Sequence, residues 1–359
     1  MQKKINVCHF TSAHHSNDVR IYLKECVSLK DAGYQVYLVA RGENQIKNGV
    51  KIIGCGEPKN RIERMLFFSH KIYKTAKKLD CDIYHFHDPE LLPYALKLKR
   101  QGKKVIFDSH EDVPSQILDK PWIPCAFRKL ISSSYRLYET YVVKQIDVVV
   151  AATSHIAKQF KKRARKIVII NNYPKLEDII FHNTPFEQRE AILCYAGGLS
   201  EIRGEHVMVN AMKGVDAELI LAGEHKKIKQ ENVTYIGSVG REAINELYGK
   251  AVAGLVLLLP TASYVYSLPI KMFEYMASGI PFVASDFPLW NKIVHKYHCG
   301  ICVPVDNQEE IKRAINYLLT HRKEAEKMGR NGRKAVENDC NWNHEKDNLI
   351  KLYQKLSEK

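Results

Sequence analysis

The chain has 359 residues, of which 45% are hydrophobic and 26% are charged. This length exceeds what one hydrophobic core usually holds, so it excludes a single small module and favours two α/β domains. The composition is that of a folded protein and excludes wholesale disorder.

The positive charge is unevenly distributed. Residues 1–175 contain 32 of the 55 Lys and Arg residues but only 16 of the 40 Asp and Glu residues, so the second half is nearly neutral. A basic half attracts nucleic acid, anionic lipid headgroups or a phosphorylated acceptor. Nucleic acid is disfavoured because the sequence has no basic and aromatic RNA-binding motif.

The chain has no apolar run long enough for a membrane-spanning helix and no signal-peptide pattern at its start. Its nine cysteines are scattered, most of them inside apolar segments. We therefore expect a cytoplasmic protein without disulfides, either free in the cytoplasm or bound peripherally to the inner face of the cytoplasmic membrane.

In chain order, the first half alternates short apolar runs with segments of helical period, which is the βαβ pattern of a parallel sheet. After a strand at 5–10 and a helix at 20–32, further strands are expected at 35–40, 82–86, 104–108, 147–152 and 166–171. This domain should close near Asn172, where a proline and a polar stretch to residue 189 indicate a hinge.

A second series of the same kind follows the hinge. Its expected strands are 192–196, 218–222, 233–236, 253–259, 281–285 and 301–303. The fold class is thus α/β, with two Rossmann-like doubly wound parallel-sheet domains facing a central cleft. Ligands of such folds bind at the carboxyl ends of the strands.

Two segments of the second half are candidates for binding phosphate. Gly197 and Gly198 form a turn after a strand, with Arg203 beside it, although such a turn more often only reverses the chain. In the segment 267–281, Lys271 lies in the first turn of a helix, where it favours a phosphate, and Glu274 is suited to a ribose diol. A solvated Lys and Glu is the ordinary alternative.

With these motifs the chain resembles the retaining family-4 glycosyltransferases (glycosyl transferases group 1), which have the GT-B fold. The resemblance is carried by segments that follow the strands of the second half and by the closing segments: 221–224, 235–237, 257–260, 271–281, 284–286, 328–333 and 341–342. It implies domains at 1–172 for the acceptor and 173–338 for the nucleotide sugar, and a final helix at 339–359 that crosses back to the first domain.

The resemblance also implies where the donor lies. The base is expected near Gly237, the ribose on Glu274, and the phosphates on Arg203, Lys271 and the amides of the glycine turn. The remaining donor-binding residues in this interpretation are Gly197, Gly198, Ser267, Leu268 and Tyr266.

Two positions depart from the family pattern. The first of the usual pair of glutamates is replaced by Tyr266, and the usual Gly-Arg before the cation reads Gly197-Gly198, which leaves Arg203 as the one cation of that turn. We interpret both as variation in donor binding, with Lys271 supplying the lost charge.

In the first half, the segment 14–22 follows the first strand. The resemblance places His15, Asp18 and Arg20 near the reacting sugar or the acceptor, whereas Asp18 alone is also explained as a helix N-cap. His87 is assigned to the acceptor, and His110 matches the family histidine that meets the hydroxyls of the transferred sugar. Glu111 is a reserve candidate for a general base.

The clustered histidines and carboxylates also admit a metal site, but neither their spacing nor the resemblance favours one, so no metal or other cofactor is expected. Two basic segments, 59–78 and 158–166, are either solvated helices or contacts with an anionic membrane that carries a lipid-linked acceptor.

The expected activity is transfer of a hexosyl or N-acetylhexosaminyl group, from a UDP-sugar by preference, to a glycan or lipid-linked acceptor with retention of configuration. The pathway would be that of a surface polysaccharide such as capsule or lipopolysaccharide. The alternatives are an inactive GT-B subunit that binds a nucleotide sugar, and a sugar-nucleotide epimerase.

Overall fold

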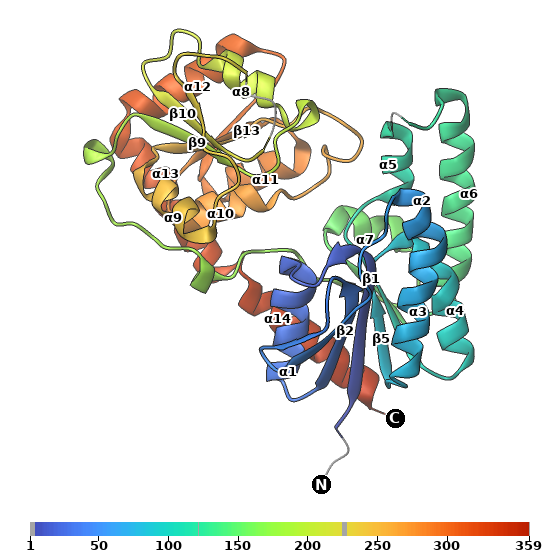
Figure 1. Ribbon diagram of the computed structural model, residues 1–359. Coiled ribbons are helices and arrows are strands. Elements are labelled where there is room, and N and C mark those ends of the chain that lie inside the picture. The colour runs from blue at the N-terminus through green and yellow to red at the C-terminus, as the bar shows by residue number, and fades with distance from the viewer. Residues whose placement is uncertain (1–3, 121, 225–227, 359) are drawn as a thin grey trace. The chain divides into compact units, whose positions relative to one another are not determined.

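The computed structural model describes residues 4–120, 122–224 and 228–358, which form two compact units (Figure 1). The first unit is Met1–Asn172 together with Asn343–Lys359, and the second is Tyr173–Trp342. The chain therefore leaves the second unit at Trp342, four residues later than the expected limit of residue 338. The expected outer limits, residues 1 and 359, lie outside the described residues.

The first unit contains an eight-stranded sheet in the order β3-β4-β2-β1-β5-β6-β7-β8. Every pairing is parallel except that of β3 with β4, which forms an antiparallel edge that the sequence pattern did not predict. The strands are β1 (Asn6–His15), β2 (Gln35–Arg41), β3 (Gln45–Lys47), β4 (Val50–Gly54), β5 (Ile83–Phe86), β6 (Lys104–Ser109), β7 (Val148–Ala151) and β8 (Ile167–Ile169).

The helices of this unit connect the strands and include the last helix of the chain. They are η1 (Val19–Cys26), α1 (Val27–Asp31), α2 (Arg61–Glu63), η2 (Arg64–Phe68), α3 (Ser69–Lys78), η3 (Pro89–Leu91), α4 (Leu92–Arg100), α5 (Val113–Asp119), α6 (Cys125–Val143), α7 (Ser154–Phe160) and α14 (Trp342–Ser357). The single helix expected at 20–32 is in fact a π-helical stretch, η1, followed by α1.

Alternation along the strands separates two faces of this sheet. Cys8 and Phe10 of β1 belong to an apolar core with residues of α3, α4, α6 and α7. His9, between them, points to the opposite face, where it meets Tyr353 of α14. One face is thus a hydrophobic core, while the other holds buried polar groups.

The second unit contains a six-stranded parallel sheet in the order β11-β10-β9-β12-β13-β14. Its strands are β9 (Ile192–Ala196), β10 (Glu218–Ala222), β11 (Val233–Tyr235), β12 (Ala253–Val256), β13 (Phe282–Ser285) and β14 (Gly300–Val303). All six expected strands exist, with small changes at their ends.

Helices cover both faces of this second sheet: α8 and α12 lie on one side, and α9, α10 and α13 lie on the other (Figure 1). The helices are α8 (Glu205–Ala211), α9 (Arg241–Lys250), α10 (Ile270–Ser278), α11 (Pro288–Tyr297), α12 (Gln308–Thr320) and α13 (Arg322–Asn338). Short 3₁₀ turns are η4 (Leu176–Asp178), η5 (Phe186–Gln188) and η6 (Glu201–Arg203).

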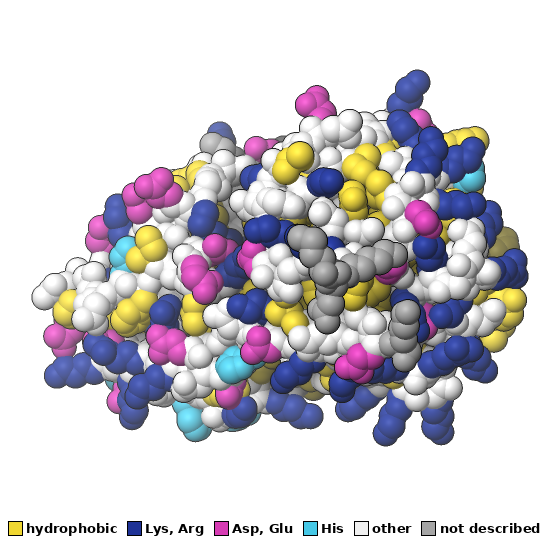
Figure 2. Space-filling view, turned by 90° about the horizontal axis from the view of Figure 1, so that it is seen from below, with side chains coloured by type: hydrophobic (Ala, Val, Ile, Leu, Met, Phe, Trp, Pro, Cys, Tyr) yellow, Lys and Arg dark blue, Asp and Glu magenta, His cyan; other side chains and the backbone are white. Residues whose placement is uncertain are grey.

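Two further features concern the helices as possible membrane spans and the charge on the surface. Among the described residues, no helix combines the length and the apolar character that crossing a bilayer requires. On the face shown in Figure 2, Lys and Arg side chains are spread among acidic and hydrophobic ones.

Candidate active site

The glycine turn after β9 brings two cations together. A Cβ atom on Gly197, whose φ is +156°, would lie 3.0 Å from Cε of Lys271, and a Cβ on Gly198 would overlap the guanidinium of Arg203. A side chain at Gly198 would displace the guanidinium, and one at Gly197 would crowd the lysine side chain. The two glycines thus allow Lys271 and Arg203 to approach the same turn, although they are 68 residues apart in the sequence.

Arg203 is held against this turn by polar contacts. Its Nη1 donates to the Gly198 carbonyl at 3.1 Å, and its Nε lies 3.5 Å from the hydroxyl of Tyr264. The next residue, Gly204, has φ +72° and passes so close to the carbonyl of Leu257 that a Cβ would overlap it. The turn is therefore packed against the end of β12.

Glu274 on α10 is the buried centre of a charged cluster. Its Oε2 accepts from Lys271 Nζ at 2.8 Å and from the Tyr248 hydroxyl at 3.2 Å, while Oε1 accepts from Arg241 at 3.0 Å. Burial by itself would raise the pKa of Glu274, but Lys271 and Arg241 outweigh it and hold that pKa below its usual value. The carboxylate is ionised and fixes both cations, so its expected role towards a ribose stays a prediction.

The other expected donor residues lie on the loop before α10 and after β11. Ser267 donates from its hydroxyl to the Tyr264 carbonyl, and its own carbonyl accepts from Trp290. Leu268 packs partly against the core, Tyr266 is 44% exposed, and Gly237 has a positive φ of 71°.

Unit 2 also contains a cavity of about 630 Å³ on the side of α8 and α12. None of the expected donor residues lines it.

In the first unit, Arg20 and Asp108 form a buried bidentate ion pair. Arg20 donates from Nε and Nη2 to the two carboxylate oxygens of Asp108, both at 2.9 Å, and from Nη1 to the carbonyl of Ile170 at 3.1 Å. Arg20 is only 5% exposed. We therefore revise the expectation that Arg20 contacts an acceptor: its guanidinium is used inside the unit to hold Asp108.

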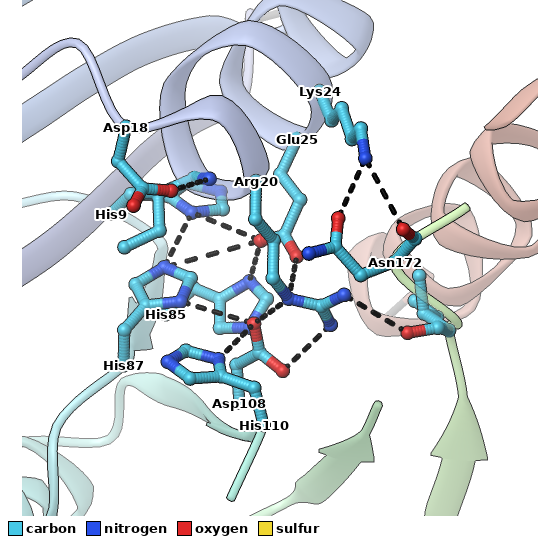
Figure 3. Close-up of polar contacts among 12 residues, drawn as sticks. His9, Asp18, Arg20, Lys24, Glu25, His85, His87, Asp108, His110 and Asn172 are labelled. Carbon is cyan, nitrogen blue, oxygen red and sulfur yellow. Dashed lines mark hydrogen bonds and ion pairs between the residues drawn. The ribbon is translucent and has the colours of Figure 1, made fainter. Parts of the chain in front are cut away.

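Three histidines and a tyrosine extend this pair into a chain of hydrogen bonds, and Figure 3 shows its histidines beside Asp108. Nδ1 of His87 lies 3.1 Å from Asp108, and Nε2 of His87 lies 3.0 Å from Nδ1 of His9. The hydroxyl of Tyr353 on α14 lies 3.1 Å from Nε2 of His9 and 2.8 Å from Nδ1 of His85.

Protonation states follow from burial. Burial lowers the pKa of His9, His85 and His87, so each ring is neutral and has one N–H. Because ionised Asp108 only accepts, His87 must donate to it from Nδ1. His9 then donates to His87, the Tyr353 hydroxyl donates to His9, and His85 donates to Tyr353, so all donors point one way. His87 uses both ring nitrogens in this chain, but it also lines a cavity of the first unit, so its acceptor role stays a prediction.

Glu25 is completely buried next to this chain. Its Oε1 lies 3.2 Å from Nε of Arg20, and its Oε2 lies 3.7 Å from Nδ1 of His9. Burial, followed by the neighbouring Asp108 carboxylate, raises the pKa of Glu25 well above its usual value. Glu25, His9, His85 and His87 are also close enough together to surround a metal ion. Their contacts with Arg20, Asp108 and Tyr353 give each of them a role without one.

His110 follows β6 at the carboxyl edge of the sheet. Its Nδ1 lies 3.3 Å from the same Asp108 oxygen that His87 contacts, and its side chain is 17% exposed. Asp108 therefore positions His110, leaving Nε2 for other partners. Glu111, the reserve base, is exposed next to it.

Asp18 is a helix cap in the structure, as the simpler interpretation held. Its carboxylate accepts from the amide of Ile21 at 2.9 Å and from His14 at 2.9 Å. His15 lies at the end of β1, more than half exposed, and pairs with Glu57 at 3.4 Å.

The predicted site residues did not include His9, Glu25, Asp88 and Tyr353. Asp88 is buried and accepts from the amides of Ser12 and Ala13, so it shapes the segment before His14. The alternation of Val7, His9 and Thr11 along one strand could have revealed His9. Tyr353 gave no signal, because only the return of α14 to the first unit brings it there.

The fold and these sites define a class of protein: two units with mainly parallel sheets, with cations on a glycine turn in the second and a polar edge around His110 in the first. Comparison with known families identifies that class. Residues 22–173 match Glycosyltransferase Family 4, and residues 176–335 match Glycosyl transferases group 1. The chain is a glycosyltransferase of this group 1 and family 4 type, with the GT-B fold.

Individual relatives are distant. D-rhamnosyltransferase WbpZ of Pseudomonas aeruginosa is 20% identical over 74% of this chain and 71% of its own length. Spore coat protein SA of Bacillus subtilis is 20% identical over 46% of this chain and 48% of its own.

Solved structures agree on the fold. Sucrose-phosphate synthase of Thermosynechococcus elongatus has a TM-score of 0.78 at 17% identity and covers 99% of both chains. HepE of Anabaena, solved with UDP, has a TM-score of 0.75 at 12% identity and covers 98% of this chain and all of its own.

Proposed function

We propose that this protein transfers a sugar from a nucleotide-diphosphate sugar to a glycan or lipid-linked acceptor, with retention of anomeric configuration and without a metal. The observation that carries the proposal is the convergence of Lys271 and Arg203 on the turn of Gly197 and Gly198. Two cations beside a glycine turn form a site suited to a diphosphate. HepE, which has the same fold, was solved with UDP-glucose, which supports UDP as the first nucleotide to test.

In the proposed reaction, the bond between the anomeric carbon and the donor diphosphate breaks while a bond to the acceptor oxygen forms on the same face. The acceptor proton passes to the departing phosphate oxygen, and the products are the nucleoside diphosphate and the glycosylated acceptor. Lys271, Arg203 and the turn amides stabilise charge on the leaving phosphate. His110, positioned by Asp108, contacts hydroxyls of the transferred sugar.

The hexosyl or N-acetylhexosaminyl donor, the role in capsule or lipopolysaccharide synthesis and the location at the inner face of the cytoplasmic membrane belong to the same proposal. The basic first half supports contact with an anionic membrane. Of the two basic segments, however, 158–166 gives little support, because α7 ends at Phe160 and Phe160 is buried in the core.

The test is release of nucleoside diphosphate, measured by mass spectrometry across UDP-, GDP- and dTDP-sugars with EDTA present. We expect turnover of one donor, and a loss of about 10²- to 10³-fold in Lys271→Ala and in Arg203→Ala, because each removes a cation from the leaving group. Lys250→Ala, which removes an exposed lysine at the end of α9, is the matched control.

Because Tyr266 replaces the first of the family's usual pair of glutamates, a second candidate function is an inactive subunit that only binds nucleotide sugar. Saturable donor binding with no turnover of any donor, even with lipid-linked acceptors, would establish that alternative. Loss of turnover on adding EDTA would contradict the metal-free reaction. It would make Glu25, His9, His85 and His87 the candidate metal ligands.

A further inference from the structure

A cavity of about 730 Å³ lies within the first unit, at the carboxyl edge of its sheet. Its floor is polar and includes His14, Asp88, His110 and Glu111. His110, which we place against the transferred sugar, thus lines this cavity. A molecule bound in the cavity can therefore place one end next to His110.

The walls of the cavity are apolar and come from η2, α5, α6 and the segment between α5 and α6. Met65, Leu66, Trp122, Ile131 and Tyr138 line it, and they are between 39% and 62% exposed. Phe127 and Leu130 of α6 add further exposed apolar surface, at 57% and 64%. Exposed apolar surface of this extent marks a binding site in a folded protein.

Three cations line the same cavity: Arg61, Arg64 and Lys120. Arg64 pairs with Glu90 at 3.0 Å, so its charge is matched within the protein. Arg61 lies over the ring of Trp122 at 4.2 Å, and Lys120 lies over the same ring at 5.6 Å. Burial, then Arg61, lowers the pKa of Lys120, so the two cations repel each other. An anion between them would relieve this repulsion.

We propose that the cavity binds the acceptor as a phosphate-linked lipid. The phosphate lies at Arg61 and Lys120, the apolar chain follows the walls formed by η2, α5 and α6, and the sugar or hydroxyl to be glycosylated reaches His110. Charge complementarity and an apolar wall in one cavity select an amphiphile over a free glycan. This inference rests on the proposed function and names its acceptor class.

Binding of a soluble probe, farnesyl diphosphate, tests the proposal on the full chain. Trp122 is 59% exposed, whereas Trp290 and Trp342 are buried, so a change in tryptophan fluorescence reports on this cavity. We expect farnesyl diphosphate to bind at least tenfold more tightly than inorganic pyrophosphate or farnesol. Arg61→Gln with Lys120→Gln should weaken it at least tenfold, and Leu66→Ser should weaken farnesyl diphosphate and farnesol alike.

The matched control is Lys77→Gln with Lys78→Gln, which removes two exposed cations from α3. Circular dichroism shows whether each variant is folded. Equal affinity of wild type and the Arg61 and Lys120 variant would overturn the proposal. So would pyrophosphate binding as tightly as the lipid, or sedimentation with anionic vesicles in the absence of lipid-diphosphate binding, which would make this surface a membrane contact only.

Donor turnover is measured separately on the same preparation, both without acceptor and with a lipid-linked acceptor. Lipid binding without turnover of any donor would contradict the proposed function and leave the cavity assignment standing. Donor turnover without lipid binding would support the proposed function and contradict the cavity assignment.

Discussion

Each unit buries a charged cluster near the carboxyl ends of its strands, and the two clusters differ in access to solvent. In the first, Arg20 and Asp108 have side chains that are 6% and 0% exposed. In the second, Glu274 is 5% exposed, but its partners Lys271 and Arg241 are 25% and 42% exposed. A sealed pair can only hold structure in place, whereas cations that reach solvent can exchange a carboxylate for a phosphate.

The largest expected effect comes from breaking the sealed pair. Asp108→Asn should lower the free energy of unfolding by about 3–5 kcal/mol, because it removes the ionised, bidentate partner of the buried Arg20 and leaves only the carboxyl of Glu25, whose pKa is raised by burial, beside it. Urea denaturation measures this. Asp31→Asn, which removes a carboxylate with 63% of its side chain exposed, is the control and should change little. A loss below about 1 kcal/mol for Asp108→Asn would mean that the cluster is not sealed.

A smaller effect is expected from the solvent-facing cluster. Glu274→Gln removes the negative charge that holds Lys271 and Arg241 and replaces one acceptor oxygen by an NH2 group. Both cations can turn to water, so the loss should be about 1–2 kcal/mol in the same denaturation experiment. Donor turnover should fall as well, because Lys271 is no longer held against the glycine turn. Loss of stability equal to that of Asp108→Asn would remove the distinction between the two clusters.

The smallest effect concerns His14 and Asp18, at the partly exposed edge of the first cluster. Burial opposes both charges, but their contact raises the pKa of His14 and, together with the Ile21 amide, lowers the pKa of Asp18 to about 2. The stabilisation from Asp18 is present above its usual pKa of 3.8 and is lost as pH falls through about 2. The stabilisation from His14 is present below 6.5 and is lost as pH rises through its raised pKa.

Thermal unfolding of His14→Gln and wild type at pH 5.5 and 8.5 measures this dependence. The free energy of unfolding of wild type should exceed that of His14→Gln by less than about 1 kcal/mol at pH 5.5, and by a smaller amount at pH 8.5. His295→Gln, an exposed histidine of α11, should show no such change. A larger stability difference at pH 8.5 than at pH 5.5 would contradict an ion pair between His14 and Asp18.

The alternation of apolar runs with helical segments determined most of the fold in advance. The two sheets and all the strands of the second unit follow from this pattern, because strand and helix periodicities are local properties of the sequence. The sequence pattern did not predict the β3 and β4 hairpin, because its two strands are only three and five residues long. The segments that carried the resemblance, including the one around Lys271 and Glu274, are also local in sequence, and the family models confirm a glycosyltransferase of the group 1 and family 4 type.

What only the tertiary structure decided is which side chains are sealed and which remain accessible. Arg20 and His87 looked like ligand contacts in the sequence, but strand alternation and the return of α14 bury them with Tyr353, which lies 333 residues from Arg20 along the chain. In the same way, Arg61, Lys120 and Trp122 meet His110 in one cavity because η2 and α5 stand at the same sheet edge. Burial and charge pairing depend on distant segments meeting in space, and no local pattern encodes that.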